Sequence, residues 1–198
     1  MKLYKNKYRI ESTRLPNYDY SSNGYYFVTI CTHKKFCYFG GIDKKQMHLS
    51  QVGKIAQQHW QEIPQHFNHV DIDEYVIMPN HVHGIVIIDN PCRDVACYVS
   101  TNNNDINQSM AQLSPKSGSL SAIIRSYKSS VTRWCRKNGD LDFRWQPRFY
   151  EHIIRDEKSL NNIRQYIINN PAKWSEDANY IEQIILIIAL VRSPIPKP

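Results

Sequence analysis

The order in which strand-like and helix-like segments follow one another constrains the fold of this chain most. Three stretches carry apolar residues at helical spacing. They run from the N-cap residue Ser50 to Pro64, from the N-cap residue Ser119 to Asn138 and Gly139, and from near Asp156 to about residue 169 before Pro171. Four segments are rich in β-branched and aromatic residues and predict strands, namely 25–32, 70–78, 81–88 and part of 149–155.

Strand, helix, strand, strand, helix, strand is the order of a ferredoxin-like βαββαβ unit, so we expect the α+β class. The predicted fold is an antiparallel sheet with helices on one face, which leaves the other face free for a site, plus a C-terminal helix that carries Tyr166. The expected organisation is a basic arm at 1–24, one domain at 25–174 with a polar, flexible loop insertion at 89–118, and a tail at 175–198.

Charge and cysteine content indicate which partners and which cellular compartment to expect. The chain has 198 residues, a formal net charge of +7 and a pI of about 9.1, which favours an anionic partner such as nucleic acid. Its five cysteines are odd in number and form no C-x-x-C pair, which argues against a disulfide framework and a cysteine-type zinc site. No signal peptide or spanning segment is visible, so a cytoplasmic setting is expected.

The pair His81 and His83 is the first candidate for chemistry. Residues two apart on a strand lie on the same side, so both imidazoles can meet one cation while Val82 points into the core. Neutral imidazole suits several divalent ions, so the pair does not name its metal. The competing interpretation is one structural histidine beside one surface histidine.

Tyr166 and Asn170 form the second candidate. They are four residues apart, so a helix would place a phenol and an amide oxygen on one face, as a nucleophile and a third metal ligand. Because Asn170 precedes Pro171, its backbone is biased away from helical dihedrals. A half-buried helix tyrosine is the competing interpretation.

A stretch rich in basic and aromatic residues runs from Ile124, within the second predicted helix, to Arg155. Cations that hold phosphates and rings that stack on bases are the features that single-strand binding needs. Tyr127 and Trp134 fall on the apolar stripe and are expected in the core. The residues predicted to bind DNA are Arg125, Lys128, Arg133, Arg136, Arg144, Trp145, Arg148 and Arg155.

Together these segments resemble the single-tyrosine HUH transposases, and among them the REP-associated tyrosine transposases. The resemblance rests on four blocks and on the arm 14–20, and it covers about residues 14–174. The blocks are 26–32 (YFVTICT), 78–83 (MPNHVH), 145–152 (WQPRFYEH) and 166–171 (YIINNP).

The resemblance implies a transposase-like catalytic domain at 25–174. His81 and His83 would hold a divalent ion, Mg²⁺ or Mn²⁺, with Asn170 as a further ligand. Tyr166 would be the nucleophile of an enzyme that nicks and rejoins hairpin-forming single-stranded DNA, such as REP elements, through a 5′-phosphotyrosine intermediate. A monomer is favoured over a homodimer, and no membrane partner is expected.

Two other functions remain open from the residues. A non-catalytic nucleic-acid-binding module on a ferredoxin-like sheet would bind without nicking and would ignore chelators. A metal-dependent hydrolase that activates a water would cleave without a protein–DNA adduct and would tolerate Tyr166→Phe.

Overall fold

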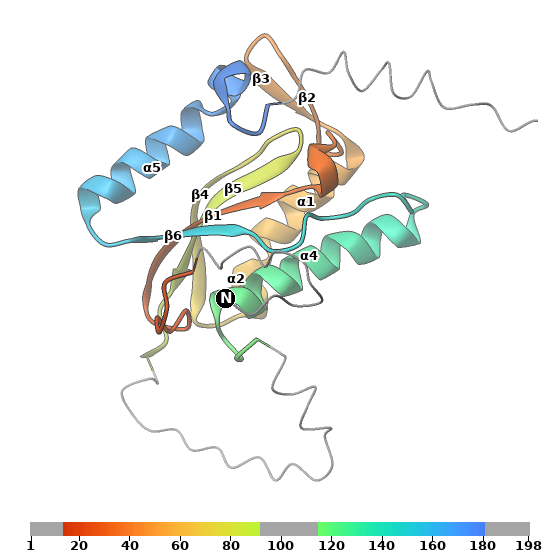
Figure 1. Ribbon diagram of the computed structural model, residues 1–198. Coiled ribbons are helices and arrows are strands. Elements are labelled where there is room, and N and C mark those ends of the chain that lie inside the picture. Colours follow the sequence, from red (N-terminus) through yellow and green to blue (C-terminus); the bar gives the residue numbers. More distant parts are fainter. Residues whose placement is uncertain (1–13, 92–114, 181–198) are drawn as a thin grey trace, which may run out of the picture.

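The structure is a computed structural model that describes residues 14–91 and 115–180 (Figure 1). Much of the expected arm, loop insertion and tail, namely residues 1–13, 92–114 and 181–198, lies outside the described residues. The fold is mixed α+β and is built on a four-stranded antiparallel sheet.

The strands expected from the sequence form this sheet in the order β4-β5-β1-β6. Their bounds are β1 Gly24–Cys31, β4 Val70–Ile77, β5 His81–Ile88 and β6 Tyr150–Ile154. Central strand β1 pairs with β5 from Gly24 opposite Ile88 to Cys31 opposite His81, and with β6 on its other side. This register places the start of β5 beside the end of β1.

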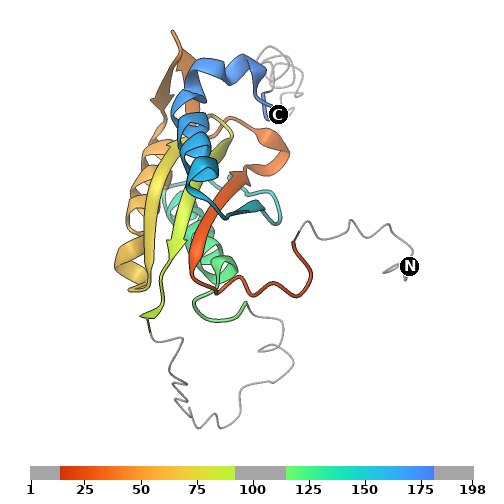
Figure 2. The same ribbon diagram turned by 90° about the vertical axis from the view of Figure 1, so that its left-hand side faces the viewer.

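Helices cover both faces of the sheet (Figures 1 and 2). The long helices are α1 Gln51–Gln61, α4 Leu120–Lys137 and α5 Glu157–Asn169. The expected N-caps Ser50 and Ser119 each accept a hydrogen bond from the backbone N–H three residues further on. Asp156, near which the third helix was expected to start, caps α5 in the same way. Helices α1 and α4 lie on one side of the sheet and α5 on the other.

Alternation along the strands explains this arrangement. One face of the sheet carries the larger core, where strand residues such as Val28, Val82 and Val86 are buried with Trp60 of α1 and Tyr127 of α4. The opposite face carries a smaller cluster beneath α5, made of Phe27, Ile85, Ile154, Leu160 and Ile167. The face expected to be free is therefore partly covered, because α5 buries its own apolar stripe there.

Several short elements were not expected from the sequence. They are the hairpin of β2 (Gly40–Asp43) and β3 (Gln46–Leu49), helix α2 (Ile63–His66), and the 3-10 helices η1 (His33–Lys35) and η3 (Pro171–Glu176). The hairpin turns through Lys44 and Lys45 with φ of 48° and 66°, a conformation usually signalled by glycine or asparagine. Helix α1 ends before Pro64, which is the second residue of α2, a position where its missing N–H costs nothing.

The described part of the arm packs on the sheet. Arg14 Nε lies 2.9 Å from Glu151 Oε1 of β6, and Tyr18 and Tyr20 pack against the larger core. None of the helices in 14–91 and 115–180 is long and apolar enough to cross a membrane.

Candidate metal centre, tyrosine and basic groove

The two histidines lie side by side at the start of β5. His81 and His83 point to the α5 side of the sheet with ring centroids 4.4 Å apart, while Val82 is buried in the larger core. Both rings are buried, with exposed fractions of 0% and 2%. The strand alternation expected from the sequence thus brings both imidazoles to one place.

Each histidine contacts a neighbouring polar side chain through its Nδ1 atom. His83 Nδ1 lies 2.9 Å from Thr29 Oγ1, and His81 Nδ1 lies 2.8 Å from Asn80 Oδ1. His81 Nε2 is buried and has no hydrogen-bond partner among the described residues. Burial, and then the neighbouring His83, hold the pKa of His81 well below its ordinary value, so its ring is neutral at pH 7, the form that binds metals.

Tyr166 of α5 reaches the same place. Its phenolic oxygen lies 3.2 Å from His83 Nε2, and the residue remains 47% exposed. Asn170 adopts helical dihedrals (φ −58°, ψ −42°) although Pro171 follows it, because the chain continues directly into η3. Tyr166 and Asn170 therefore do lie four residues apart on one helical turn.

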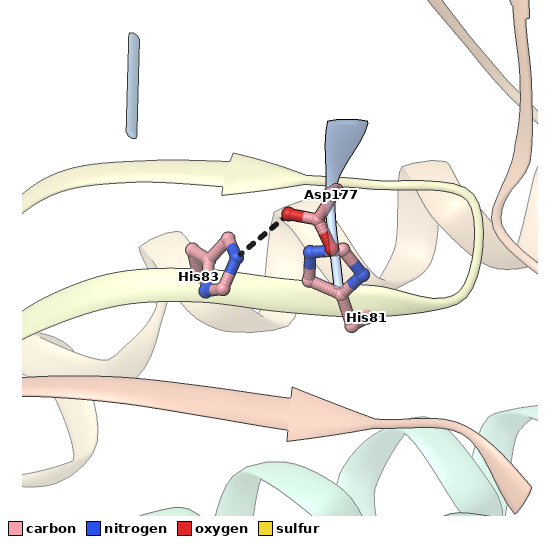
Figure 3. A group of neighbouring side chains, drawn as sticks. All are labelled: His81, His83 and Asp177. Atoms are coloured by element: carbon pink, nitrogen blue, oxygen red, sulfur yellow. Dashed lines mark ion pairs between the residues drawn. The ribbon is translucent and has the colours of Figure 1, made fainter. Parts of the chain in front are cut away.

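Asp177, just beyond η3, is the residue that the sequence reasoning missed. Its Oδ2 lies 3.9 Å from His83 Nε2 and 3.4 Å from the Tyr166 hydroxyl, which donates to it. One ligand atom each from His81, His83 and Asp177 lies within 4.8 Å of the other two (Figure 3). Asp177 stands 94 positions after His83, inside the expected tail, where no local pattern singles it out.

Asn170 turns one side of its amide toward Asp177. Asn170 Nδ2 donates to Asp177 Oδ2 at 3.1 Å, while Asn170 Oδ1 is buried without a hydrogen-bond partner in the described part of the chain. Because a buried amide oxygen without a partner is costly, this atom fits a cation or a hydrogen-bond donor as its partner. Asn170, which the sequence predicts as a further ligand, thus lies beside the histidines and is hydrogen-bonded to the carboxylate of Asp177.

The carboxylate changes the acidity of its neighbours. Burial alone would raise the pKa of Asp177, but the contacts with His83, the Asn179 backbone and Asn170 outweigh it and hold this pKa well below its ordinary value. Partial burial and the charge of Asp177 raise the pKa of Tyr166. The phenol is therefore un-ionised at neutral pH beside an ionised carboxylate.

Helix η3 packs against the histidines through Trp174. Trp174 is buried and its ring lies 5.9 Å from that of His81. The side chain of Asp177 is 3% exposed, so the three candidate ligands are shielded while the Tyr166 ring is accessible. Two imidazoles together with carboxylate and amide oxygens are a set of donor atoms that suits a divalent ion.

Most residues predicted to bind DNA gather on one groove of about 630 Å³ between α4 and the segment before β6. Those that line it are Arg125, Lys128, Arg133, Arg136, Trp145 and Arg148. Among the described residues, the charged side chains that line this groove are all basic, so it presents a positively charged surface. Arg144 and Arg155 are exposed but lie outside the lining.

Trp145 is more deeply packed than the sequence suggests. Its ring lies 5.4 Å from Phe39 and 5.8 Å from Tyr127, and its indole N–H donates to Lys128 O at 3.0 Å. An isolated β-bridge joins Trp145 to Thr32, and the ring packs against the larger core. Tyr127 is buried and Trp134 partly buried against the core, in agreement with their places on the apolar stripe.

Comparisons with known proteins show which sequences and folds this chain is similar to. No protein-family model matches the chain. An uncharacterized protein of Haemophilus influenzae is 43% identical over 173 residues, covering 86% of this chain and 93% of that protein, so the two belong to one family. A second protein of that organism, "Putative REP-associated tyrosine transposase", is 26% identical over 159 residues, covering 78% of this chain and 74% of its own length.

Among solved structures, a REP-associated tyrosine transposase bound to a REP hairpin has a similar fold, with a TM-score of 0.52 and 19% identity over 93% of this chain and 89% of that one. The chain is therefore transposase-like in fold. The resemblance to the REP-associated tyrosine transposases that the sequence motifs indicated is confirmed both in sequence and in fold.

Proposed function

We propose that this protein is a metal-dependent, single-stranded DNA endonuclease and strand transferase of the HUH type. It nicks and rejoins hairpin-forming DNA, including REP-type hairpins, through a 5′-phosphotyrosine on Tyr166. The observation that carries the proposal is the convergence of the Tyr166 hydroxyl with His83 Nε2, 3.2 Å away, inside the cluster of His81, His83 and Asp177.

The scaffold supports this proposal. The order β4-β5-β1-β6, with helical crossovers between β1 and β4 and between β5 and β6, supports the proposed ferredoxin-like βαββαβ unit. Helix α5 follows the fourth strand of that unit and carries Tyr166 across the face that bears the histidines.

His81 and His83 would hold the divalent ion, Mg²⁺ or Mn²⁺, together with an oxygen of Asp177 or Asn170. The unpartnered atoms His81 Nε2 and Asn170 Oδ1 support this assignment, because both are buried lone pairs without a donor among the described residues. A bound divalent ion would stabilise negative charge on the phosphate oxygen and on the phenolate.

Tyr166 would act as the nucleophile. Its Oη forms a bond to phosphorus while the bond from phosphorus to the 3′ oxygen breaks, so the phenol loses its proton and the leaving 3′ oxygen gains one. The phosphotyrosine keeps the energy of the original phosphodiester, so attack by the 3′-OH of another strand reverses the step without ATP. Asp177 and His83 would hold the hydroxyl in place for this attack.

The basic groove is the proposed DNA surface. Lys128 is held there by the carbonyls of Gln146 and Arg148, at 2.7 and 3.1 Å. Arg148 has a left-handed backbone (φ 67°), which costs energy for a non-glycine residue and is often found at functional sites. The positive lining suits a phosphate backbone.

A labelled single-stranded REP-type hairpin incubated with Mn²⁺ tests the reaction. We expect a covalent protein–DNA adduct on a denaturing gel, no adduct with Tyr166→Phe, and nearly unchanged hairpin binding by that variant. Tyr150→Phe is the matched control, since Tyr150 is 51% exposed and Tyr166 47%. Cleavage without an adduct would favour the hydrolase, and binding without cleavage the non-catalytic module. Either result would refute the proposal.

The salt dependence of hairpin binding tests the groove. Removing a side chain that binds one phosphate should reduce the slope of log K against log salt by roughly 0.7–0.9. We expect this reduction for Arg133→Ala and for Arg136→Ala. Lys54→Ala removes the same charge from the exposed side of α1 and should leave the slope unchanged, so equal slopes in all three variants would contradict the groove.

A further inference from the structure

Asn80, in the tight turn between β4 and β5, is a buried polar residue to which the proposed reaction gives no role. It has an exposed fraction of 0%. Its amide makes three contacts, with Nδ2 donating to Lys35 O at 3.1 Å and to Asn179 O at 2.8 Å, and Oδ1 lying 2.8 Å from His81 Nδ1. A buried amide whose hydrogen-bonding groups are used in this way is a rigid element.

We infer that Asn80 is a positioning residue that assembles the metal site, by directing the lone pair of His81 Nε2 into the site and by tying the Asp177 loop to β5. The inference rests on the metal centre of the proposed function. It concerns a residue that neither binds the ion nor touches DNA in that proposal.

The chemistry of the contacts determines the tautomer of His81. Backbone carbonyls only accept hydrogen bonds, so the two oxygens of Lys35 and Asn179 must face the Nδ2 side of the amide. The Oδ1 side then faces His81, and since Oδ1 only accepts, His81 Nδ1 must carry the proton. In the neutral ring, Nε2 is left as an unprotonated lone pair, and it is this atom that is buried without a partner among the described residues.

The same amide holds the loop that brings in the carboxylate. Asn179 O accepts from Asn80, and Asn179 N donates to Asp177 Oδ1 at 2.6 Å, which forms an Asx-type turn. Through these two bonds the first residue of β5 and the Asp177 loop share one anchor. Orienting contacts of this kind on ligating histidines typically matter for affinity by about 10–100-fold.

Substitutions at this position separate the two roles. Asn80→Asp keeps an acceptor for His81 Nδ1 but cannot donate to Lys35 O or Asn179 O. Asn80→Ala removes both functions. Ser50→Ala removes the N-cap of α1 and destabilises the fold at a residue that contacts none of the candidate ligands, so it controls for general loss of stability.

The first measurement is the tautomer of His81 in the metal-free full chain, by long-range ¹H–¹⁵N NMR with His81→Gln for assignment. We expect the Nδ1–H form in the wild type, Ser50→Ala and Asn80→Asp, and the loss of this preference in Asn80→Ala. A wild-type His81 protonated on Nε2 would overturn the inference whatever the protein does with metals.

The second measurement is Mn²⁺ affinity by calorimetry. We expect Asn80→Ala to bind Mn²⁺ about 10–100-fold more weakly and Ser50→Ala to bind normally. In Asn80→Asp, faster hydrogen exchange of the Asn179 amide should report a released loop. Wild-type affinity in Asn80→Ala, or an unchanged Asn179 amide in Asn80→Asp, would overturn the inference. A wild type that binds no Mn²⁺ would instead refute the metal centre of the proposed function.

Discussion

Gly84→Ala should destabilise the protein because the core leaves no room for a methyl group at this position. Gly84 lies in central strand β5, between β1 and β4, directly after His83. A Cβ at residue 84 would stand 2.9 Å from Trp60 Cε2 and closer still to Cζ2. Trp60 is fully buried between the rings of Tyr75 and Tyr127, so its indole cannot swing away.

Two opposing terms give the size of the effect. Forcing a methyl group into a packed core costs about 1–3 kcal/mol, and contacts this short place Gly84→Ala at the upper end. Replacing a strand glycine by alanine recovers about 0.5–1 kcal/mol of backbone entropy. The expected loss of unfolding free energy is therefore about 2 kcal/mol, roughly a 30-fold change in the folding equilibrium constant.

Urea unfolding of the single and double variants tests this reasoning. Trp60→Phe removes the indole atoms that the new methyl group would meet, together with a buried N–H that has no partner among the described residues. Gly84→Ala should therefore cost about 1 kcal/mol less in the Trp60→Phe background than in the wild type. Gly139→Ala, where nothing lies within 4 Å, should add to Trp60→Phe without coupling. A neutral Gly84→Ala, or an additive double variant, would refute the steric argument.

Three further predictions concern charge. Burial lowers the pKa of Lys128 to about 8, so hairpin affinity should fall as the pH rises through 8, and Lys128→Met should abolish this step in a binding titration. Burial, opposed by Arg14, raises the pKa of Glu151, so its contribution to stability is present below the unfolded carboxyl pKa and is lost as the pH rises through the folded value. Thermal melts from pH 4 to 7 should therefore show wild type losing stability relative to Glu151→Gln, and parallel curves would contradict this. The Arg164 pair with Asp73 joins α5 to β4 at a partly exposed position, so Arg164→Ala should lower the melting temperature slightly and less at high salt; a large drop that salt does not change would mean another role.

Local patterns in the sequence determined most of the secondary structure. The β5 strand and the N-caps Ser50 and Ser119 are confirmed, because apolar β-branched runs and capping hydrogen bonds depend on residues only a few positions apart. The pairing of His81 with His83 on one side of a strand follows from the same short-range geometry. The hairpin of β2 and β3 was missed because its turn uses Lys44 and Lys45 instead of residues that prefer positive φ.

Tertiary structure alone decided which distant residues meet. Asp177 reaches the histidines only because α5 buries its apolar face on the sheet and η3 then turns the chain back over β5. Trp145 likewise packs at the edge of the larger core, where a bridge to Thr32 and a hydrogen bond to Lys128 O hold it, although its local sequence resembles an exposed loop. Contacts between residues about a hundred positions apart depend on how whole elements pack, and no spacing within the sequence encodes that distance.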